Sequence, residues 1–147
     1  MRQRLTPLIA LGAGLFAATA YAAIPDKKPE ELRKEAEQIV VGRLVDVYQA
    51  PPKREKDAEV TPFVVEVKVT KVEKGSRFKV GDLAHVRYSN ARWVGKGLPP
   101  VGWGDGNIFI DAKPGDTVRV FLARDPEGGY HPLIPNGFQA ASAAKPK

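Results

Sequence analysis

The chain has 147 residues, enough for one domain with a single core, and it contains no cysteine. The absence of cysteine excludes thiol catalysis, thiolate zinc sites and disulfide bonds. The formal net charge is +6, but the 23 basic residues are interspersed with 17 acidic ones, a distribution that does not favour a nucleic-acid-binding protein.

Residues 1–22 have the pattern of a secretory signal peptide. Arg2 and Arg4 precede an apolar run, and the segment ends in Ala20-Tyr21-Ala22. A basic start, a short apolar middle and a small-x-small end are typical of a cleaved export signal. We therefore expect cleavage after Ala22, a periplasmic or secreted protein, and no stable membrane span afterwards. An uncleaved membrane anchor is the alternative, although the apolar run is short for a spanning helix.

Residues 23–38 are predicted to form a lead-in and a short helix. Pro29 is followed at once by two glutamates, and both features suit a helix start, where a backbone donor is unpaired and the helix end is positive. The helix is expected from Pro29 to Gln38. Leu32 and Ala36 fall on one side of it and are expected to pack on the rest of the domain.

The clearest periodic pattern runs from Phe63 to Val69, where every second residue is apolar. This alternation predicts a long β-strand with one buried face. Another strand is predicted at Ile39–Tyr48, in which Gly42 indicates a bulge or a bend. Further strands are expected, in chain order, at Leu83–Tyr88, Asn107–Ala112 and Thr117–Ala123, with an edge piece near His131–Ile134.

Other segments are expected to lack regular structure. Gln49–Val60 contains two prolines and six charged residues, which predicts a mobile surface loop. Ser89–Asn107 holds five glycines, two prolines and both tryptophans of the chain. Such a long irregular segment inside a compact domain is often functional. Residues 135–147 are small and polar and are predicted to be a disordered tail.

The irregular segment Ser89–Asn107 supplies the predicted ligand-binding residues, which are Arg92, Trp93, Lys96 and Trp103. The two tryptophans are suited to stack on a ring of a ligand, while Arg92 or Lys96 pairs with an anionic group. The alternative is that both tryptophans fold inward and cap the core, since a small core needs large side chains. The sequence leaves both interpretations open.

The sequence has no strong catalytic or metal-binding motif. His85 and His131 are the only histidines, and they lack the spacing of a metal site. There is no nucleophile motif GxSxG and no glycine pattern for a phosphate cradle. We therefore predict a non-catalytic protein with no metal and no cofactor. The alternative is a hydrolase of envelope glycan or peptide that acts through Asp105, Asp111 and a histidine.

The order of these features resembles a known family. A short helix leads into IVVGRLVDV, a second strand ends in VEKG, and a VGD turn, a variable loop and a Gly-Asp turn into VRVFL follow. Over residues 37–124 this order is similar to the OB-fold barrel of the netrin-like and tissue-inhibitor-of-metalloproteinase group, especially its bacterial exported relatives.

The resemblance implies a mainly β fold, a small OB-like Greek-key barrel over residues 39–134 with a short N-terminal helix. It further implies a protein that binds other molecules and catalyses nothing. Export and the basic charge favour an envelope protein or an anionic envelope polymer as partner, and no nucleic acid is expected. Protease inhibition is not carried over, because the animal inhibitors coordinate the protease zinc through an N-terminal cysteine, and this chain has no cysteine.

Overall fold

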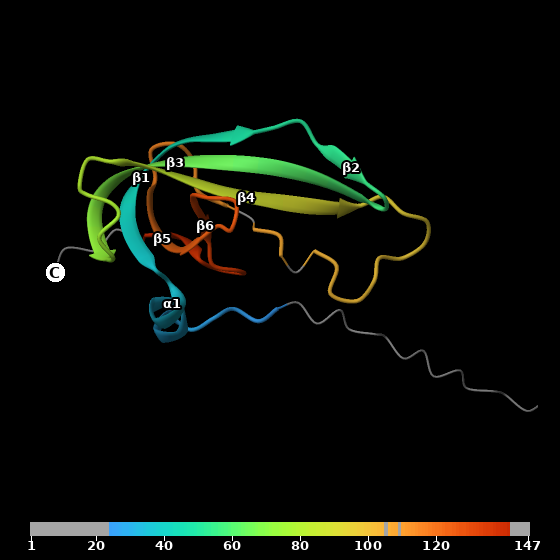
Figure 1. Cartoon of the computed structure of the whole chain (residues 1–147), viewed down its shortest axis with the longest axis horizontal. Coiled ribbons are helices and arrows are strands. Elements are labelled where there is room, and N and C mark those ends of the chain that lie inside the picture. The colour runs from blue at the N-terminus through green and yellow to red at the C-terminus, as the bar shows by residue number, and fades with distance from the viewer. Residues whose placement is uncertain (1–23, 105, 109, 142–147) are drawn as a thin grey trace, which may run out of the picture.

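The structure is a computed structural model that describes residues 24–104, 106–108 and 110–141 (Figure 1). The predicted signal peptide and the last six residues of the predicted tail lie outside the described residues. In the described part the elements are α1 (Pro29–Glu35), β1 (Gln38–Gln49), β2 (Lys53–Glu55), β3 (Ala58–Lys74), β4 (Leu83–Trp93), β5 (Thr117–Arg124), β6 (Tyr130–Pro132) and β7 (Phe138–Ala140). None of the described helical residues forms a segment long and apolar enough to span a membrane.

The strands form one mixed sheet that is arranged in a ring. Around the ring the order is β1, β3, β4, β6 and β5, and β5 pairs again with β1. These pairings are antiparallel except β4 with β6, which are parallel and joined by the single residue pair Val86–Tyr130. β2 and β7 are added outside the ring, on β3 and β5 respectively.

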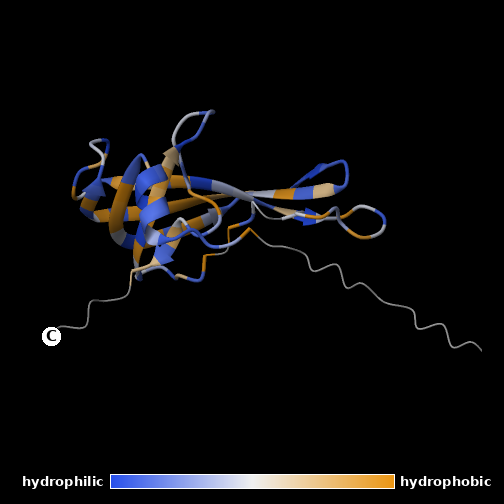
Figure 2. Cartoon of the chain, turned by 90° about the horizontal axis from the view of Figure 1, so that it is seen from below, coloured by the Kyte–Doolittle hydropathy of each residue, from blue (hydrophilic) through white to orange (hydrophobic). Residues whose placement is uncertain are grey.

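The core lies inside the ring, and β3 contributes most clearly to it. Val65, Val67 and Val69 are buried, which confirms the predicted alternation, because every second side chain of a strand points to the same face. The same alternation of hydrophobic and polar residues is visible along the ring strands in Figure 2. The inward residues of the other strands that pack with them are Val40, Leu44, Ala84, Val86, Val118, Val120, Leu122 and Tyr130.

Helix α1 covers a second apolar cluster on the outside of the ring. This cluster consists of Leu32, Ala36, Ile39, Phe121 and Leu133. Ile39 of β1 and Phe121 of β5 are cross-strand partners, and they point away from the inner core because their sequence neighbours Val40 and Leu122 point into it. Strands β1 and β5 are thus apolar on both faces at this end, which explains the nearly continuous apolar sequence of β1.

Gly42 allows β1 to lie close against β3. The pairing register shifts between Val41 and Gly42, but the extra residue is Thr70 of β3, so the irregularity lies opposite Gly42 and not in β1 at the glycine. A Cβ atom at this position would lie 2.6 Å from Cγ1 of Val67 and would also meet the backbone of Lys68. Any larger residue would therefore push the two longest strands apart.

The ends of α1 and β4 differ from the sequence predictions. α1 ends at Glu35 instead of Gln38, because Ala36 is already extended and the N–H of Glu37 donates to the carbonyl of Leu122 at 2.8 Å. β4 continues to Trp93, so the first residues of the predicted loop Ser89–Asn107 belong to a strand.

Some segments also have a different structure from the one predicted. The predicted mobile loop Gln49–Val60 contains β2, which pairs with the start of β3 as a hairpin. The described residues of Asn107–Ala112 are not in a strand. Residues 138–140 form β7 on the edge of β5, so the prediction of a disordered tail from residue 135 is wrong up to residue 141.

Candidate ligand-binding site

The pair of strands β3 and β4 extends beyond the core (Figure 1). The residues on its inward face become polar along this extension. Going outward from the buried pair Val65–Val86, the cross-strand pairs on this face are Phe63–Tyr88, Thr61–Asn90 and Glu59–Arg92. The face is thus apolar in the core, aromatic at the edge of the core, and polar beyond it.

Phe63 and Tyr88 form a stacked aromatic pair where the core ends. Their ring centroids are 4.9 Å apart and their planes differ by 7°. Both residues are half-buried, and burial raises the pKa of the Tyr88 hydroxyl. The hydroxyl is therefore neutral at physiological pH, so that the pair offers an uncharged aromatic surface.

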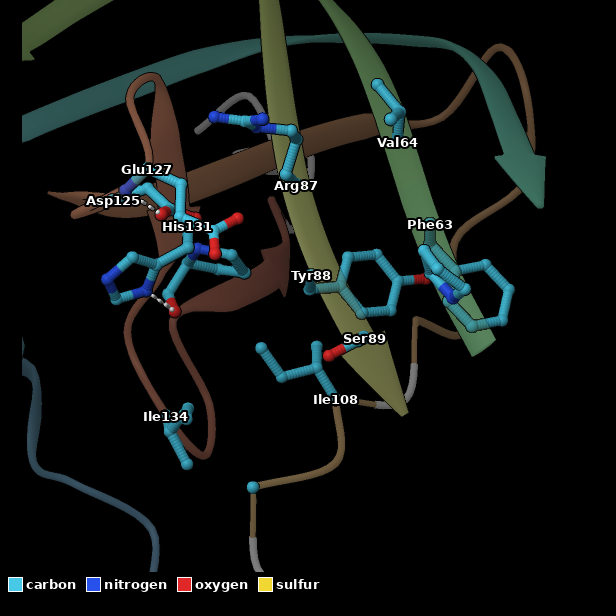
Figure 3. A pocket seen from close by; sticks show the side chains of 13 residues that line it. Phe63, Val64, Arg87, Tyr88, Ser89, Ile108, Asp125, Glu127, His131 and Ile134 are labelled. Carbon is cyan, nitrogen blue, oxygen red and sulfur yellow. Dashed lines mark hydrogen bonds between the residues drawn. The ribbon is translucent and has the colours of Figure 1, made fainter. Parts of the chain in front are cut away.

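A cavity of about 390 Å³ lies next to this aromatic pair (Figure 3). Its walls come from parts of the chain that are far apart in sequence: β3 with β4, residues 106–108, and β6 with the turn that precedes it. The apolar lining includes Phe63, Tyr88, Ile108, Pro132 and Ile134, and the ionisable lining comprises Arg87, Asp125, Glu127 and His131. The volume is in the range of small-molecule sites.

The ionisable groups of the cavity come from β4, from the β5–β6 turn and from β6. Arg87 lies against Gly129, where an added Cβ atom would be 2.9 Å from its guanidinium nitrogen. Arg87 forms no ion pair with any carboxylate of the described residues. The Asp125 carboxylate accepts a hydrogen bond from the N–H of Glu127 at 2.8 Å, and Nδ1 of His131 lies 3.1 Å from the carbonyl oxygen of Pro132.

Two asparagines hold residues 107–108 against β4, an arrangement we call the asparagine clasp. The Asn107 amide accepts from the N–H of Ala91 at 2.7 Å and donates to its carbonyl at 2.9 Å. Asn90 does the same to Ile108, at 2.8 and 2.9 Å. Each side-chain amide supplies the donor and acceptor that a neighbouring strand would otherwise provide. The clasp thereby places Ile108 in the wall of the cavity.

The structure brings the two predicted tryptophans together, outside both core clusters. The rings of Trp93 and Trp103 meet edge to face, with centroids 4.9 Å apart and planes at 72°. Both are half-buried, and neither belongs to the clusters inside or outside the ring. Trp93 Nε1 donates to the carbonyl of Gly97 at 3.1 Å. Trp103 Nε1 is buried and has no hydrogen-bond partner among the described residues.

The predicted cations Arg92 and Lys96 have different surroundings. Arg92 points to the opposite face of β4 from Trp93, since successive residues of a strand alternate. Its Nη2 and Nε lie 2.8 and 3.2 Å from the Glu59 carboxylate, and it lines a second cavity of about 330 Å³ that also includes Phe63. Lys96 is exposed and forms no ion pair with a described residue.

Sequence reasoning missed Phe63, Tyr88, Arg87 and the β5–β6 turn as parts of a site. Phe63 follows the period of the buried valines, so it was indistinguishable from a core residue. The available signal was that an aromatic residue ends the apolar pattern on each of two consecutive strands. That signal becomes meaningful only once Phe63 and Tyr88 are known to be cross-strand partners.

The residues of the alternative hydrolase are not gathered in this cavity. His131 lines it, whereas His85 is exposed and its Nε2 lies 3.0 Å from the Glu66 carboxylate, outside the cavity lining. Asp111 is exposed and is not a lining residue, and Asp105 lies outside the described residues. Among the residues that the structure describes, no group of three or more His, Asp or Glu could hold a metal ion.

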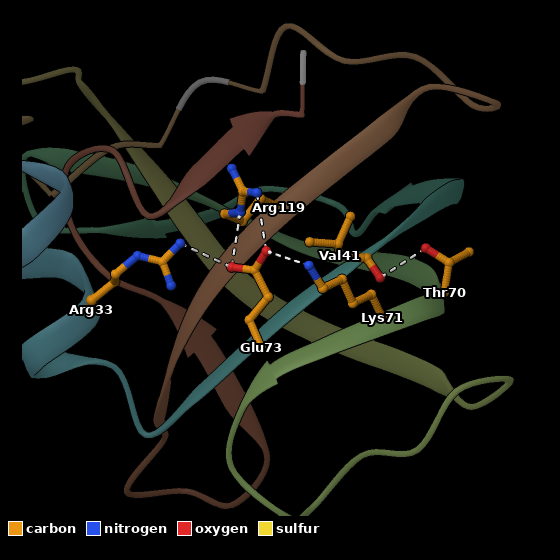
Figure 4. A network of polar contacts seen from close by, with 6 residues as sticks. All are labelled: Arg33, Val41, Thr70, Lys71, Glu73 and Arg119. Carbon is orange, nitrogen blue, oxygen red and sulfur yellow. Dashed lines mark hydrogen bonds and ion pairs between the residues drawn. The ribbon is translucent and has the colours of Figure 1, made fainter. Parts of the chain in front are cut away.

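A network of charged side chains is centred on Glu73, on the outer face of the ring (Figure 4). Its carboxylate is 9% exposed and receives Arg119 at 3.1 and 3.2 Å, Arg33 at 3.2 Å and Lys71 at 3.6 Å. These partners come from α1, β3 and β5, and the residues that line the cavity do not include them. The network therefore ties elements together and is separate from the candidate site.

Comparison of the chain with protein-family models, with curated proteins and with solved structures found no significant match. Function is therefore assigned from the cavity, its charges and the fold described above.

Proposed function

We propose that this protein is an exported, non-catalytic binding module built on an OB-like Greek-key barrel. The ring order supports the barrel: the chain passes from β4 to β5 on the far side of the ring, and β6 then fills the position between them. The signal-peptide pattern of residues 1–22 supports export. In OB folds the ligand is commonly bound on the face and loops around the second and third barrel strands, which here correspond to β3 and β4.

The ligand site of this proposal is the cavity next to Phe63 and Tyr88, and the ligand class is an acidic sugar. The observation that carries the proposal is one cavity lined by the aromatic pair Phe63–Tyr88 and by Arg87, whose guanidinium has no carboxylate partner among the described residues. Arg87 lies on the opposite face of β4 from Tyr88, against Gly129 of the β5–β6 turn. Sugar rings pack on aromatic faces, and an arginine fork suits a carboxylate. Asp125 and Glu127 supply acceptors for sugar hydroxyls.

The predicted binding loop Ser89–Asn107 takes part in this site through its two ends. Ser89 and Gly106 line the cavity together with Ile108, whereas the tryptophan pair lies farther along the loop. In this proposal Phe63 and Tyr88 take the stacking role that the sequence suggested for the tryptophans, and Arg87 takes the role suggested for Arg92 or Lys96.

Calorimetric titration of the exported chain with short uronic-acid oligosaccharides, and with neutral sugars of the same length, tests the proposal. We expect the acidic sugars to bind more tightly, and Arg87→Gln to weaken their binding about tenfold or more, as expected for a lost charged pair. Neutral sugars should bind the variant as they bind the wild type. Arg92→Gln is the matched control, because the Arg92 guanidinium is already paired with Glu59.

The proposal is abandoned if no sugar binds, or if Arg87→Gln and Arg92→Gln weaken binding equally. Prolonged incubation separates the hydrolase alternative from simple binding. If the wild type shortens the oligosaccharides and His131→Gln does not, catalysis is assigned to this cavity. If the wild type leaves the oligosaccharides at their original length, the result supports a binding module.

A further inference from the structure

Residues 98–101, Leu-Pro-Pro-Val, form an apolar tip on the loop that follows β4. Leu98 and Val101 are 84% and 79% exposed, more than any other large hydrophobic residue that the structure describes. Gly97 and Gly102 flank the tip with φ angles of 80° and 79°, a conformation in which glycine is favoured. The loop extends beyond the body of the ring (Figure 1), and Figure 2 shows its hydrophobic colouring. Neighbouring exposed hydrophobic residues on a projecting loop indicate an interaction surface.

The backbone of the apolar tip is suited to an environment with little water. Pro99 and Pro100 have no N–H group, so the tip presents fewer donors that would lose their hydration in an apolar phase. The carbonyl of Pro100 accepts a hydrogen bond from the N–H of Trp103 at 3.1 Å, and the carbonyl that immediately precedes the tip accepts one from the indole of Trp93. Part of the polar backbone is thus satisfied within the loop.

The tryptophan pair forms the base of the apolar tip. Tryptophan is enriched at the boundary between the hydrocarbon and the headgroups of a bilayer, because its ring is apolar and its N–H is polar. The buried indole nitrogen of Trp103 has no acceptor among the described residues. Because this nitrogen is buried, a lipid oxygen would reach it only if docking moved the loop, so the placement of the pair at the headgroups rests on its rings.

Basic side chains lie around the same end of the molecule. The β2–β3 hairpin is adjacent to the loop, since Ala58 pairs with Trp93 and the N–H of Val94 donates to the carbonyl of Asp57 at 2.8 Å. Residues 53–59 and 92–96 together contain five basic and three acidic side chains, which leaves a net charge of +2. Positive charge beside an apolar insertion segment favours a surface with anionic lipids.

We propose that the apolar tip docks this protein on a lipid bilayer that contains anionic headgroups, with Leu98 and Val101 entering the interface. The tryptophan pair then lies at the level of the headgroups, and the basic residues contact the lipid phosphates. Since only two aliphatic side chains enter, docking is weak and reversible. This surface is distinct from the sugar cavity, so the two proposals succeed or fail separately.

Vesicle flotation combined with tryptophan fluorescence tests the docking, because both tryptophans of the chain stand at the base of the tip. The exported chain is mixed with phosphatidylcholine vesicles that contain no phosphatidylglycerol or roughly one quarter of it. We expect flotation and a blue shift of the emission with the anionic vesicles, and a reduction of both at high salt. The double variant Leu98→Asp with Val101→Asp should reduce vesicle binding at least about tenfold.

Val80→Asp is the matched control, since Val80 is 69% exposed and lies in the turn at the opposite end of β4. It should bind vesicles as the wild type does, and circular dichroism should show the same fold for all variants. The proposal is overturned if neither vesicle causes a blue shift or if the double variant binds like the wild type. If sedimentation velocity shows that the wild type and Val80→Asp are dimers and the double variant is a monomer, the tip instead binds a second copy of the chain.

Discussion

At the residue scale, the Glu73 carboxylate is subject to opposing effects. Burial raises its pKa, because the charged form loses water, whereas the hydrogen bond and charge of Arg119, and then the charges of Arg33 and Lys71, lower it. The net result is a pKa below the ordinary value of 4.5. A carboxyl group with a lower pKa in the folded state stabilises that state above its unfolded pKa, and the contribution is lost as the pH falls through the folded pKa.

We therefore predict that Glu73→Gln lowers the free energy of unfolding by about 1 to 3 kcal/mol near pH 7, because three cations lose their shared partner. The gap between wild type and variant should close as the pH falls below the folded pKa of Glu73, where the wild-type carboxyl group is also neutral. Urea denaturation near pH 7 and at pH values well below 4.5 measures both effects. Glu55→Gln is the control, since Glu55 is exposed on β2 and forms no ion pair with a described residue. Equal stability of the Glu73 variant and wild type near pH 7 would contradict the prediction.

At the element scale, hydrogen bonds that do not come from a strand ladder decide where the chain runs after β4. Residues 107–112 have a strand-like sequence, yet residues 107–108 are held by the asparagine clasp. Its bonds join residues 16 and 18 positions apart, and no local sequence pattern predicts such a pairing. A second asparagine of the same kind, Asn136, bonds the N–H and the carbonyl of Lys27 at 3.1 and 3.0 Å, and so attaches the lead-in to the segment before β7.

We predict that Asn107→Ala destabilises the protein by about 1 to 3 kcal/mol, because the N–H and the carbonyl of Ala91 both lose their partner. Hydrogen exchange at the Ala91 amide should accelerate strongly and become the most affected position. Asn136→Ala is the matched control: it removes the same number of side-chain bonds, but it should accelerate exchange at Lys27 and leave Ala91 protected. Protection of Ala91 in the Asn107 variant would show that the clasp does not hold this segment.

The sequence predicted elements well where side-chain periodicity was long, and poorly where backbone pairing alone decides. β3 was found because its apolar alternation extends over several residues, and β1 because its sequence is nearly continuously apolar. β2 and β7 were missed, since each has only three residues and is in a strand because the neighbouring strand offers free backbone groups. The predicted helix began correctly at Pro29, but its end depends on the contact of Glu37 with β5.

At the scale of the whole molecule, periodicity identified a mainly β chain but could not order its strands around the ring. The candidate site shows the same limit. Its cavity combines Phe63, Arg87 and His131 from three different strands, and only the folded arrangement brings them to one place. The sequence did draw attention to the loop with both tryptophans, because glycine, proline and tryptophan occur there together. It could not predict that Arg92 would face away from them and pair with Glu59.

The proposed export concerns the whole chain, and we predict that the exported protein begins at Ala23. Signal peptidase recognises small residues at the end of the apolar segment, so intact-mass analysis of the exported fraction should give a chain of residues 23–147. Ala22→Lys removes the small residue at the cleavage position and should leave the leader attached. Wild-type protein that retains Met1 in the membrane fraction would instead support an uncleaved anchor.

The parallel contact between β4 and β6 consists of one residue pair, Val86 with Tyr130, fewer than at any other junction of the ring. We therefore expect the ring to open most easily at this junction. The cavity spans this junction, because its lining includes Arg87 and Tyr88 of β4 and His131 and Pro132 of β6. A ligand that contacts both strands would stabilise the closed ring, because separation of β4 from β6 would require the ligand to dissociate first. Ligand binding should therefore slow the hydrogen exchange of the amides around Tyr130.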